Sequence, residues 1–230
     1  MAHLDTEWEG RMSTNSGTAL WQHLLVKLPL IAILRGIRPA EAVSVAGALQ
    51  SAGFLCVEIP LNSPNALASI RAVRDHFDGE LLVGAGTVLT QADVVAVNDA
   101  GAQIVVSPNT DSQVITISRR LGLISLPGFA TPTEALQAIA AGATGLKLFP
   151  AEGTPPTALG AIKAVLPGKY PIFPVGGITI SRMPGFIAAG ADGFGIGSSL
   201  YTPGMAAEEV VQRASPFVRT WMVARSSPMA

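Results

Sequence analysis

The chain has 230 residues, a length that fits one large domain or two small ones. Hydrophobic residues make up 49% of it and charged residues only 13%, so we expect a sizeable core and a surface partly covered in an oligomer. The net charge of -1 gives no electrostatic reason to expect nucleic acid or an acidic membrane as a partner. One cysteine, Cys56, excludes an internal disulfide and fits a reducing, cytoplasmic location.

The first stretch, residues 1–17, is polar and contains Asp5, Glu7 and Glu9. It lacks the apolar segment of a signal peptide, so we expect a loosely ordered extension there. No run in the chain reaches the roughly 18 apolar residues of a membrane-spanning helix. No linker divides the remainder, and residues 18–230 are expected to form a single domain.

From Trp21 onward one pattern repeats: a helix-like segment ends in glycine, and a short apolar run follows. Glycine suits the end of a helix because it adopts the left-handed conformation of a C-terminal cap without strain. The apolar runs are continuous rather than alternating, which is typical of parallel strands covered on both faces. Variants of the pattern are SAGFLCVEIP, DAGAQIVVSP, RLGLISLPG, AAGATGLKLFP and AAGADGFGIG.

Eight strand–helix units in roughly 200 residues predict an α/β fold, the (β/α)8 TIM barrel, with an additional N-terminal helix over Thr18–Lys27. The main rival is an open doubly wound sheet. It would carry a Gly-rich nucleotide-binding turn after the first strand, and Arg35–Pro39 is not such a turn. The predicted strands are Leu30–Gly36, Leu55–Leu61, Leu81–Val88, Ile104–Pro108, Leu123–Gly128, Gly145–Pro150, Ile172–Ile178 and Gly193–Leu200.

Charged residues near the carboxyl ends of these strands are of interest because barrel enzymes build their active sites there. Three residues qualify: Arg35, Glu58 and Lys147. Side chains alternate between the two faces of a strand, so Leu146 and Leu148 would face the helices and Lys147 the barrel interior. The same alternation turns Arg35 and Glu58 inward. The three charges are therefore expected to converge on one mouth.

Lys147 has two interpretations. It could form a structural ion pair with Glu58, but burial of such a pair costs several kcal/mol per ion. We favour a functional interpretation because the three inward charges all lie at the catalytic end. A desolvated lysine beside a cation such as Arg35 would have a depressed pKa. The neutral amine could attack a carbonyl and form a Schiff base, with Glu58 moving the protons.

Glycine-rich segments end the seventh and eighth strands, at Phe173–Thr179 and Gly193–Tyr201. Barrels often bind phosphate at this point through loop amides, and glycine lets the backbone approach an anion closely. The alternative is that the glycines only shape tight turns. We favour a phosphate site because the two segments occur together. Its candidate residues are Gly176, Gly177, Gly197, Ser198 and Ser199.

Other polar residues carry weaker signals. Thr87, at the end of the third strand, is a candidate hydroxyl for a substrate carboxylate, and it could equally be the neighbour of a helix N-cap. Cys56 is expected to fill the barrel interior, since no histidine is placed to activate it. The histidines, His3, His23 and His76, lie outside the predicted strands. No group of His, Asp and Glu has metal-ligand spacing, so no metal site is predicted.

Taken in order, the motifs resemble those of a known enzyme family. LPLIAILRGI, AGFLCVEIPLNSP, VGAGTVL, SPN, PGFATPTEA, GLKLFPAE, PVGGI and GIGSSLY are similar to segments of the 2-dehydro-3-deoxy-6-phosphogalactonate aldolases of the KDPG/KHG aldolase family. The similarity runs from about Leu28 to Tyr201. It implies a class I aldolase, a carbon–carbon lyase on a (β/α)8 barrel, which forms a homotrimer and needs no cofactor. The implied ligands are a phosphorylated 2-keto-3-deoxy sugar acid and pyruvate.

The resemblance also implies roles for the candidate residues. Lys147 would form the imine, and Glu58 would act as the acid and base. The residues that would bind substrate are Arg35 and Thr87, with Gly177, Gly197 and Ser198 at the phosphate.

Asn62 separates this chain from the sister family that acts on the gluconate epimer. Those enzymes resemble VEVTLRTP at the second strand, whereas this chain has VEIPLNSP, with Asn62 in place of their arginine. Arg35 could supply the missing positive charge, so we favour the galactonate epimer over the gluconate epimer or dual specificity.

Two further classes remain open. A phosphosugar isomerase or epimerase needs two opposed acid/base groups, and the strands offer one carboxylate. A non-catalytic sugar-phosphate-binding barrel has no need of Lys147.

Overall fold

The computed structural model of the chain describes residues 16–226. The first helix begins at Ser16, two residues before its predicted start, and residues 1–15 of the predicted extension lie outside the described part. No helix within residues 16–226 is long and apolar enough to cross a membrane. The helices are α1 (Ser16–Lys27), α2 (Pro39–Ser51), α3 (Ala66–His76), α4 (Gln91–Asp99), α5 (Ser112–Arg120), α6 (Pro132–Ala141), the short 3-10 helix η1 (Ala151–Gly153), α7 (Pro156–Val165), α8 (Met183–Ala188) and α9 (Ala207–Ser226).

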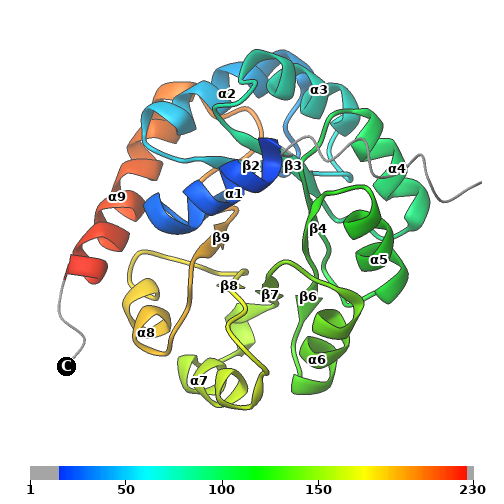
Figure 1. Cartoon of the computed structure of the whole chain (residues 1–230). Helices are drawn as coiled ribbons and strands as arrows, with labels where there is room; N and C mark the ends of the chain where they lie inside the picture. The colour runs from blue at the N-terminus through cyan, green and yellow to red at the C-terminus, as the bar shows by residue number, and fades with distance from the viewer. Residues whose placement is uncertain (1–15, 227–230) are drawn as a thin grey trace, which may run out of the picture.

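The strands lie at the centre of the molecule and the helices surround them (Figure 1). Six strands form one curled sheet in the order β5-β4-β3-β2-β1-β9, and three more form a second sheet in the order β6-β7-β8. Every strand pair is parallel, so the predicted α/β class is confirmed. The strands are β1 (Leu30–Ile33), β2 (Cys56–Pro60), β3 (Leu82–Gly86), β4 (Ile104–Val106), β5 (Ile124–Leu126), β6 (Gly128–Phe129), β7 (Leu146–Leu148), β8 (Ile172–Pro174) and β9 (Phe194–Ile196).

The predicted fifth strand is divided in two by Pro127. Its first part, β5, pairs with β4, and its second part, β6, pairs with β7. Proline has no N–H to donate to a ladder, but its carbonyl still accepts a hydrogen bond from the Lys147 N–H at 2.9 Å. At the other side of the second sheet, an isolated parallel bridge joins Val175 to Gly195.

The alternation predicted for the strands is confirmed by two separate hydrophobic cores. Leu146 and Leu148 belong to the larger core, between the strands and the helices. Cys56 and Phe173 belong to the smaller one, which fills the space enclosed by the strands. Cys56 is fully buried there, as expected of a residue that fills the interior.

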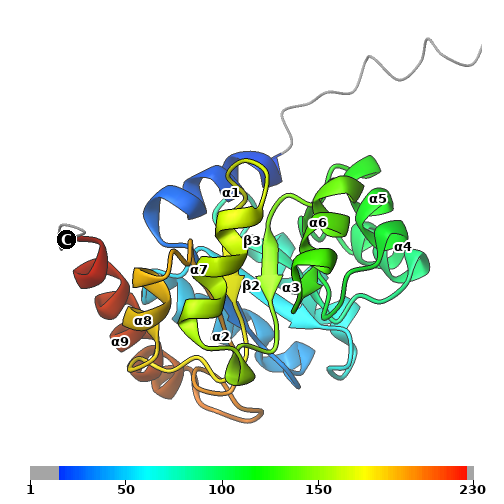
Figure 2. The same ribbon diagram turned by 90° about the horizontal axis from the view of Figure 1, so that it is seen from below.

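Helix α1 closes one end of this inner core. Its Trp21 and Leu24 pack with Ile31 and Leu82, and the ring centroid of Trp21 lies 5.6 Å from that of Phe173. Figure 1 shows α1 lying across the strands. Figure 2 shows α1 on one side of the strands and the orange loop that follows β9 on the opposite side. The carboxyl ends of the strands therefore open away from α1.

Helices α4 and α6 begin at threonine N-caps, Thr90 and Thr131. The Thr90 hydroxyl accepts the N–H of Asp93 at 3.1 Å, and the Thr131 hydroxyl that of Glu134 at 3.4 Å. Each acidic side chain in turn accepts the backbone N–H of its threonine, which completes a capping box. These caps fix where α4 and α6 leave the loops at the carboxyl ends of the strands.

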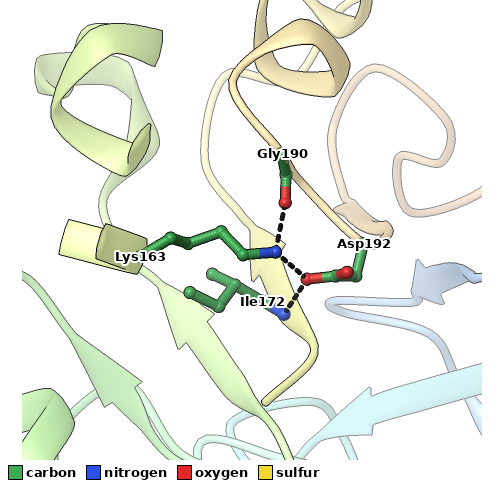
Figure 3. A network of polar contacts seen from close by, with 4 residues as sticks. All are labelled: Lys163, Ile172, Gly190 and Asp192. Atoms are coloured by element: carbon green, nitrogen blue, oxygen red, sulfur yellow. Dashed lines mark hydrogen bonds and ion pairs between the residues drawn. The ribbon is translucent and has the colours of Figure 1, made fainter. Parts of the chain in front are cut away.

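A polar network holds the opposite end of β8 (Figure 3). The Asp192 carboxylate accepts the ammonium of Lys163 at 2.7 Å and the N–H of Ile172 at 2.9 Å. The Lys163 ammonium also donates to the carbonyl of Gly190. The network ties α7 to the starts of β8 and β9, and so fixes these two strands at the ends opposite their carboxyl ends.

Candidate active site

A cavity of about 480 Å³ lies at the carboxyl ends of β1, β7, β8 and β9. Seven residues predicted from the sequence line it, namely Arg35, Lys147, Gly176, Gly177, Gly197, Ser198 and Ser199. Glu58, within β2, and Thr87, directly after β3, are not among the residues that line it. The other lining residues are Ile33, Gly36, Phe149, Glu152, Val175, Ile178, Tyr201, Thr202 and Pro203.

Lys147 is in the middle of β7 and is 5% exposed, with its ammonium 4.8 Å from the ring centroid of Phe149. Burial lowers the pKa of Lys147; the nearby carboxylate of Glu58 opposes that shift, and the charge of Arg35 adds to it. Within the described residues, no hydrogen bond or ion pair joins Lys147 to Glu58. The interpretation of Lys147 and Glu58 as a structural ion pair is therefore not supported, and Lys147 lines the cavity with a lowered pKa.

Glu58 is on β2, 2% exposed, and its position in the register lies between Ile33 of β1 and Gly84 of β3. Burial raises the pKa of the Glu58 carboxyl, and the charges of Lys147 and Arg35 partly reverse this. A raised pKa makes a carboxyl a better proton donor and a stronger base than an ordinary carboxyl.

Gly86 provides the room for this carboxyl. A methyl group on the Gly86 α-carbon would overlap the Glu58 carboxyl group. Any larger residue at position 86 would therefore push the carboxyl away from its place beside the inner core.

Arg35 lies in the loop after β1 and is exposed at the mouth of the cavity. Its guanidinium donates to the side-chain carbonyl of Asn62 at 2.7 Å, and the next N–H, that of Gly36, donates to the Ser63 hydroxyl at 2.9 Å. The loop after β2 thus orients the loop after β1. From the sequence, Asn62 was interpreted only as the loss of the arginine found in the sister family. In the structure it also accepts a hydrogen bond from Arg35, the residue proposed to supply the positive charge instead.

Thr87 has a backbone φ of 56°, a left-handed conformation that is strained for a β-branched residue. The next residue is held at both of its backbone groups. The Val88 N–H donates to the carbonyl of Val106 at 3.3 Å, and the Val88 carbonyl accepts the Ser107 hydroxyl at 2.8 Å. Thr87 is therefore flanked by two hydrogen-bonded residues, Gly86 and Val88, and no sequence pattern indicated the part played by Ser107.

Several backbone N–H groups in the cavity wall have no hydrogen-bond partner among the described residues. They include those of Gly177 and Ile178 after β8, and of Gly197 and Ser198 after β9. Donors in a cavity wall that have no protein acceptor are available to a bound anion. Gly177 has a φ of 57°, and successive amides in such turns form anion-binding concavities. The arrangement fits a phosphate group.

Two further lining residues were missed by sequence analysis. Glu152 of η1 packs its side chain against Gly177, where a methyl group would overlap it. Tyr201 donates its hydroxyl to the Glu41 carboxylate at 3.1 Å, and burial, followed by the charge of Glu41, raises the pKa of Tyr201 to about 12. Tyr201 therefore stays protonated near neutral pH and does not act as a base.

His23 in α1 and His76 in α3 lie outside the strands, as predicted, and His3 lies outside the described residues. Among the described residues, no three His, Cys, Asp or Glu side chains are grouped so that they could hold a metal ion.

The model of the KDPG and KHG aldolase family matches residues 22–215. The chain belongs to this family. It is therefore an aldolase, a carbon–carbon lyase. A probable 2-dehydro-3-deoxy-6-phosphogalactonate aldolase of Rhizobium meliloti (strain 1021) is 50% identical over 186 residues, which cover 81% of this aldolase and 88% of the relative. The 2-dehydro-3-deoxy-6-phosphogalactonate aldolase of Escherichia coli (strain K12) is 46% identical over 201 residues, 87% of this chain and 97% of that one.

Relatives called 2-dehydro-3-deoxy-phosphogluconate aldolase match this aldolase less well. The protein of that name from Treponema pallidum (strain Nichols) is 32% identical over 164 residues, which cover 71% of this chain and 78% of the relative.

Solved structures agree with this assignment. One described as native KDPGal has a TM-score of 0.86 and 46% identity, and the match covers 88% of this aldolase and 98% of that chain. A KDPG aldolase from Legionella pneumophila, with pyruvate captured as a covalent carbinolamine intermediate, has a TM-score of 0.70 and 25% identity over 92% of this chain and 98% of that one.

Proposed function

We propose that this aldolase cleaves 2-dehydro-3-deoxy-6-phosphogalactonate to pyruvate and glyceraldehyde 3-phosphate in galactonate catabolism. The observation that carries the proposal is the composition of one cavity. A buried lysine with a lowered pKa lies in its wall, and free backbone N–H groups suited to phosphate lie in the same wall. The two relatives at 50% and 46% identity bear the name of this activity.

The first half of the proposed reaction forms an iminium ion. The lone pair of the neutral Lys147 amine attacks the C2 ketone, and a proton moves through water from the nitrogen to the former carbonyl oxygen to give a neutral carbinolamine. The protonated Glu58 carboxyl then donates its proton, through water, to the hydroxyl, which departs as water and leaves the iminium ion and the Glu58 carboxylate. The carbinolamine of the Legionella pneumophila relative has the same chemistry.

The second half breaks the bond between C3 and C4. The C4 hydroxyl loses its proton and becomes the aldehyde of glyceraldehyde 3-phosphate, while the electron pair of the broken bond moves into the iminium and forms an enamine. Protonation of the enamine at C3 and addition of water release pyruvate and return Lys147 as a free amine. The scheme requires neither a metal nor an organic cofactor.

We assign binding roles to the rest of the site. The free N–H groups around Gly177, Gly197 and Ser198 bind the phosphate, since anions are stabilised by converging backbone donors. The Thr87 hydroxyl binds the substrate carboxylate. Arg35, at the mouth, supplies the positive charge that complements a substrate bearing two anionic groups.

The gluconate epimer is the rival substrate. We favour the galactonate epimer because Asn62 stands where the gluconate enzymes have an arginine, and Arg35, hydrogen-bonded to Asn62, supplies a positive charge in its place. Initial rates of pyruvate release from both epimers, at equal concentrations below KM, test this choice. A higher kcat/KM for the galactonate compound supports the proposal, and a strong preference for the gluconate compound contradicts it.

We further infer that the two sheets are parts of one eight-stranded (β/α)8 barrel within a single domain. Its fifth strand would comprise β5 and β6, and its seventh and eighth would meet at the bridge between Val175 and Gly195.

We also propose a cytoplasmic homotrimer. The low charge content and exposed apolar residues such as Leu89, Val95 and Leu136 support an oligomer, and light scattering after size-exclusion chromatography measures its mass.

A further inference from the structure

Arg182 lies immediately before α8, behind the turn that carries the free N–H groups of Gly177 and Ile178. It does not line the cavity. Its guanidinium donates from Nη1 to the carbonyl of Gly177 at 2.8 Å and from Nη2 to the carbonyl of Ala151 at 2.7 Å. Charge-assisted bonds of this length are among the stronger hydrogen bonds in proteins.

The two carbonyls belong to different loops. Ala151 is in η1, after the strand that carries Lys147, and Gly177 is in the turn after β8. The Ala151 N–H also donates to the carbonyl of Val175 at 2.8 Å, so Ala151 is bonded to the second loop through both of its backbone groups. The planar fork of the guanidinium therefore fixes the distance between the lysine-bearing strand and the phosphate turn.

The same bond sets the direction of an amide. In a trans peptide the carbonyl and the following N–H point in opposite directions. Because the Arg182 guanidinium holds the Gly177 carbonyl, the Ile178 N–H of the same peptide points away from Arg182, and Ile178 lines the cavity. Without this bond the peptide could turn over easily, since Gly176 and Gly177 have little steric restriction.

We propose that Arg182 is a positioning residue for the phosphate group of the substrate. Its guanidinium binds the carbonyls of Gly177 and Ala151 and so orients the N–H groups after β8 toward the anion. Its positive charge also attracts the phosphate electrostatically. This inference rests on the proposed function, because it assumes that the free N–H groups bind phosphate. A purely structural brace would instead stabilise the fold without distinguishing phosphorylated from unphosphorylated ligands.

The test compares Arg182→Ala and Arg182→Lys with the wild type. We expect KM for the phosphorylated substrate to rise about 10-fold in Arg182→Ala, with a much smaller change in kcat, since two charge-assisted bonds that order the binding loop are lost. Arg182→Lys keeps the charge but loses the fork, so an intermediate KM is expected. Added guanidinium chloride at low millimolar concentration should lower the KM of Arg182→Ala and leave that of the wild type unchanged.

A second measurement does not depend on turnover. Calorimetric binding of glycerol 3-phosphate should weaken in Arg182→Ala, whereas borohydride trapping of pyruvate on Lys147 should keep its wild-type rate. Arg213→Ala is the matched control, because Arg213 pairs with Glu209 on the exposed side of α9, and it should change neither measurement.

Two results would overturn the positioning role. One is an unchanged KM and glycerol 3-phosphate affinity in Arg182→Ala; the other is an equal loss of phosphate binding and pyruvate trapping, which indicates a structural brace. Failure of the proposed function would look different, because the wild type itself would then neither trap pyruvate nor bind glycerol 3-phosphate.

Discussion

The carboxyl group of Glu58 on β2 lies against the α-carbon of Gly86 on β3, with no room for a methyl group between them. Glycine at position 86 is therefore a condition for the position of the proposed proton shuttle. Gly86→Ala should displace the carboxyl and lower kcat by about 10- to 100-fold, because small displacements of catalytic groups have effects of that size. Steady-state kinetics with the phosphorylated substrate measure the change.

Gly160→Ala is the control for this substitution. Gly160 is in α7, and the nearest atom to an added methyl group is the Ala189 carbonyl oxygen at 3.8 Å, an ordinary contact. Activity should be unchanged in Gly160→Ala. Full activity in Gly86→Ala as well would show that the carboxyl of Glu58 does not need its present position.

The dependence of Lys147 on its charged neighbours predicts two pH shifts of opposite sign. Burial lowers the pKa of Lys147, the carboxylate of Glu58 raises it, and the charge of Arg35 lowers it. Arg35→Gln should therefore raise the pKa of Lys147 and move the acid limb of imine formation to higher pH. Glu58→Gln should lower that pKa and move the limb to lower pH, although proton transfer itself becomes slower.

The rate of borohydride trapping at saturating pyruvate, measured across pH, checks both shifts. Saturation removes any effect of Arg35 on pyruvate affinity. Shifts in the same direction for the two variants would show that the acid limb does not report the Lys147 amine.

Cys56 should be unreactive in the native protein. It is fully buried in the inner core, and burial, followed by the charge of Glu58, raises the pKa of the Cys56 thiol well above its ordinary value. A protonated, inaccessible thiol does not attack disulfide reagents. Titration with a chromogenic disulfide should release no thiol signal until denaturant unfolds the chain, and rapid reaction without loss of structure would contradict this packing.

Ser107 should support the strained backbone of Thr87. Ser107→Ala removes the donor to the Val88 carbonyl, which costs about 1 kcal/mol of unfolding free energy for a bond of this kind. With Val88 less firmly held, Thr87 can relax from its left-handed conformation, so KM for pyruvate should rise more than kcat falls. Ser107→Thr keeps the hydroxyl and should restore KM. Equal KM values in all three proteins would contradict a role for the Ser107 hydrogen bond in carboxylate binding by Thr87.

Local patterns predicted the direction of Lys147 correctly. Strand alternation has a period of two, so the burial of Leu146 and Leu148 against the helices followed from the sequence, as did the inward position of Cys56. Glycine at position 142 ends α6 with a φ of 96°, as the repeated helix–glycine pattern indicated. These features depend on neighbours along the chain, which is why a sequence can reveal them.

The features that escaped prediction depend on contacts between distant residues. Arg182 meets the Ala151 carbonyl across 31 positions, and Arg35 meets Asn62 across 27. Neither pair has a spacing that a periodic pattern can detect. Free N–H groups are likewise invisible in a sequence, because they are defined by the partners that they lack. The division of the fifth strand also escaped prediction, although its cause is local: Pro127 has no N–H to donate within a strand.

The central claim is that Lys147 forms a covalent imine with pyruvate. The most direct test incubates the wild-type protein with pyruvate and borohydride and then maps the modified peptide by mass spectrometry, with Lys147→Arg as a control that keeps a basic side chain. The account predicts one reduced pyruvate adduct, on Lys147, and none at that position in Lys147→Arg, together with loss of cleavage activity. An unmodified Lys147 in the wild type, with activity surviving in Lys147→Arg, would contradict it.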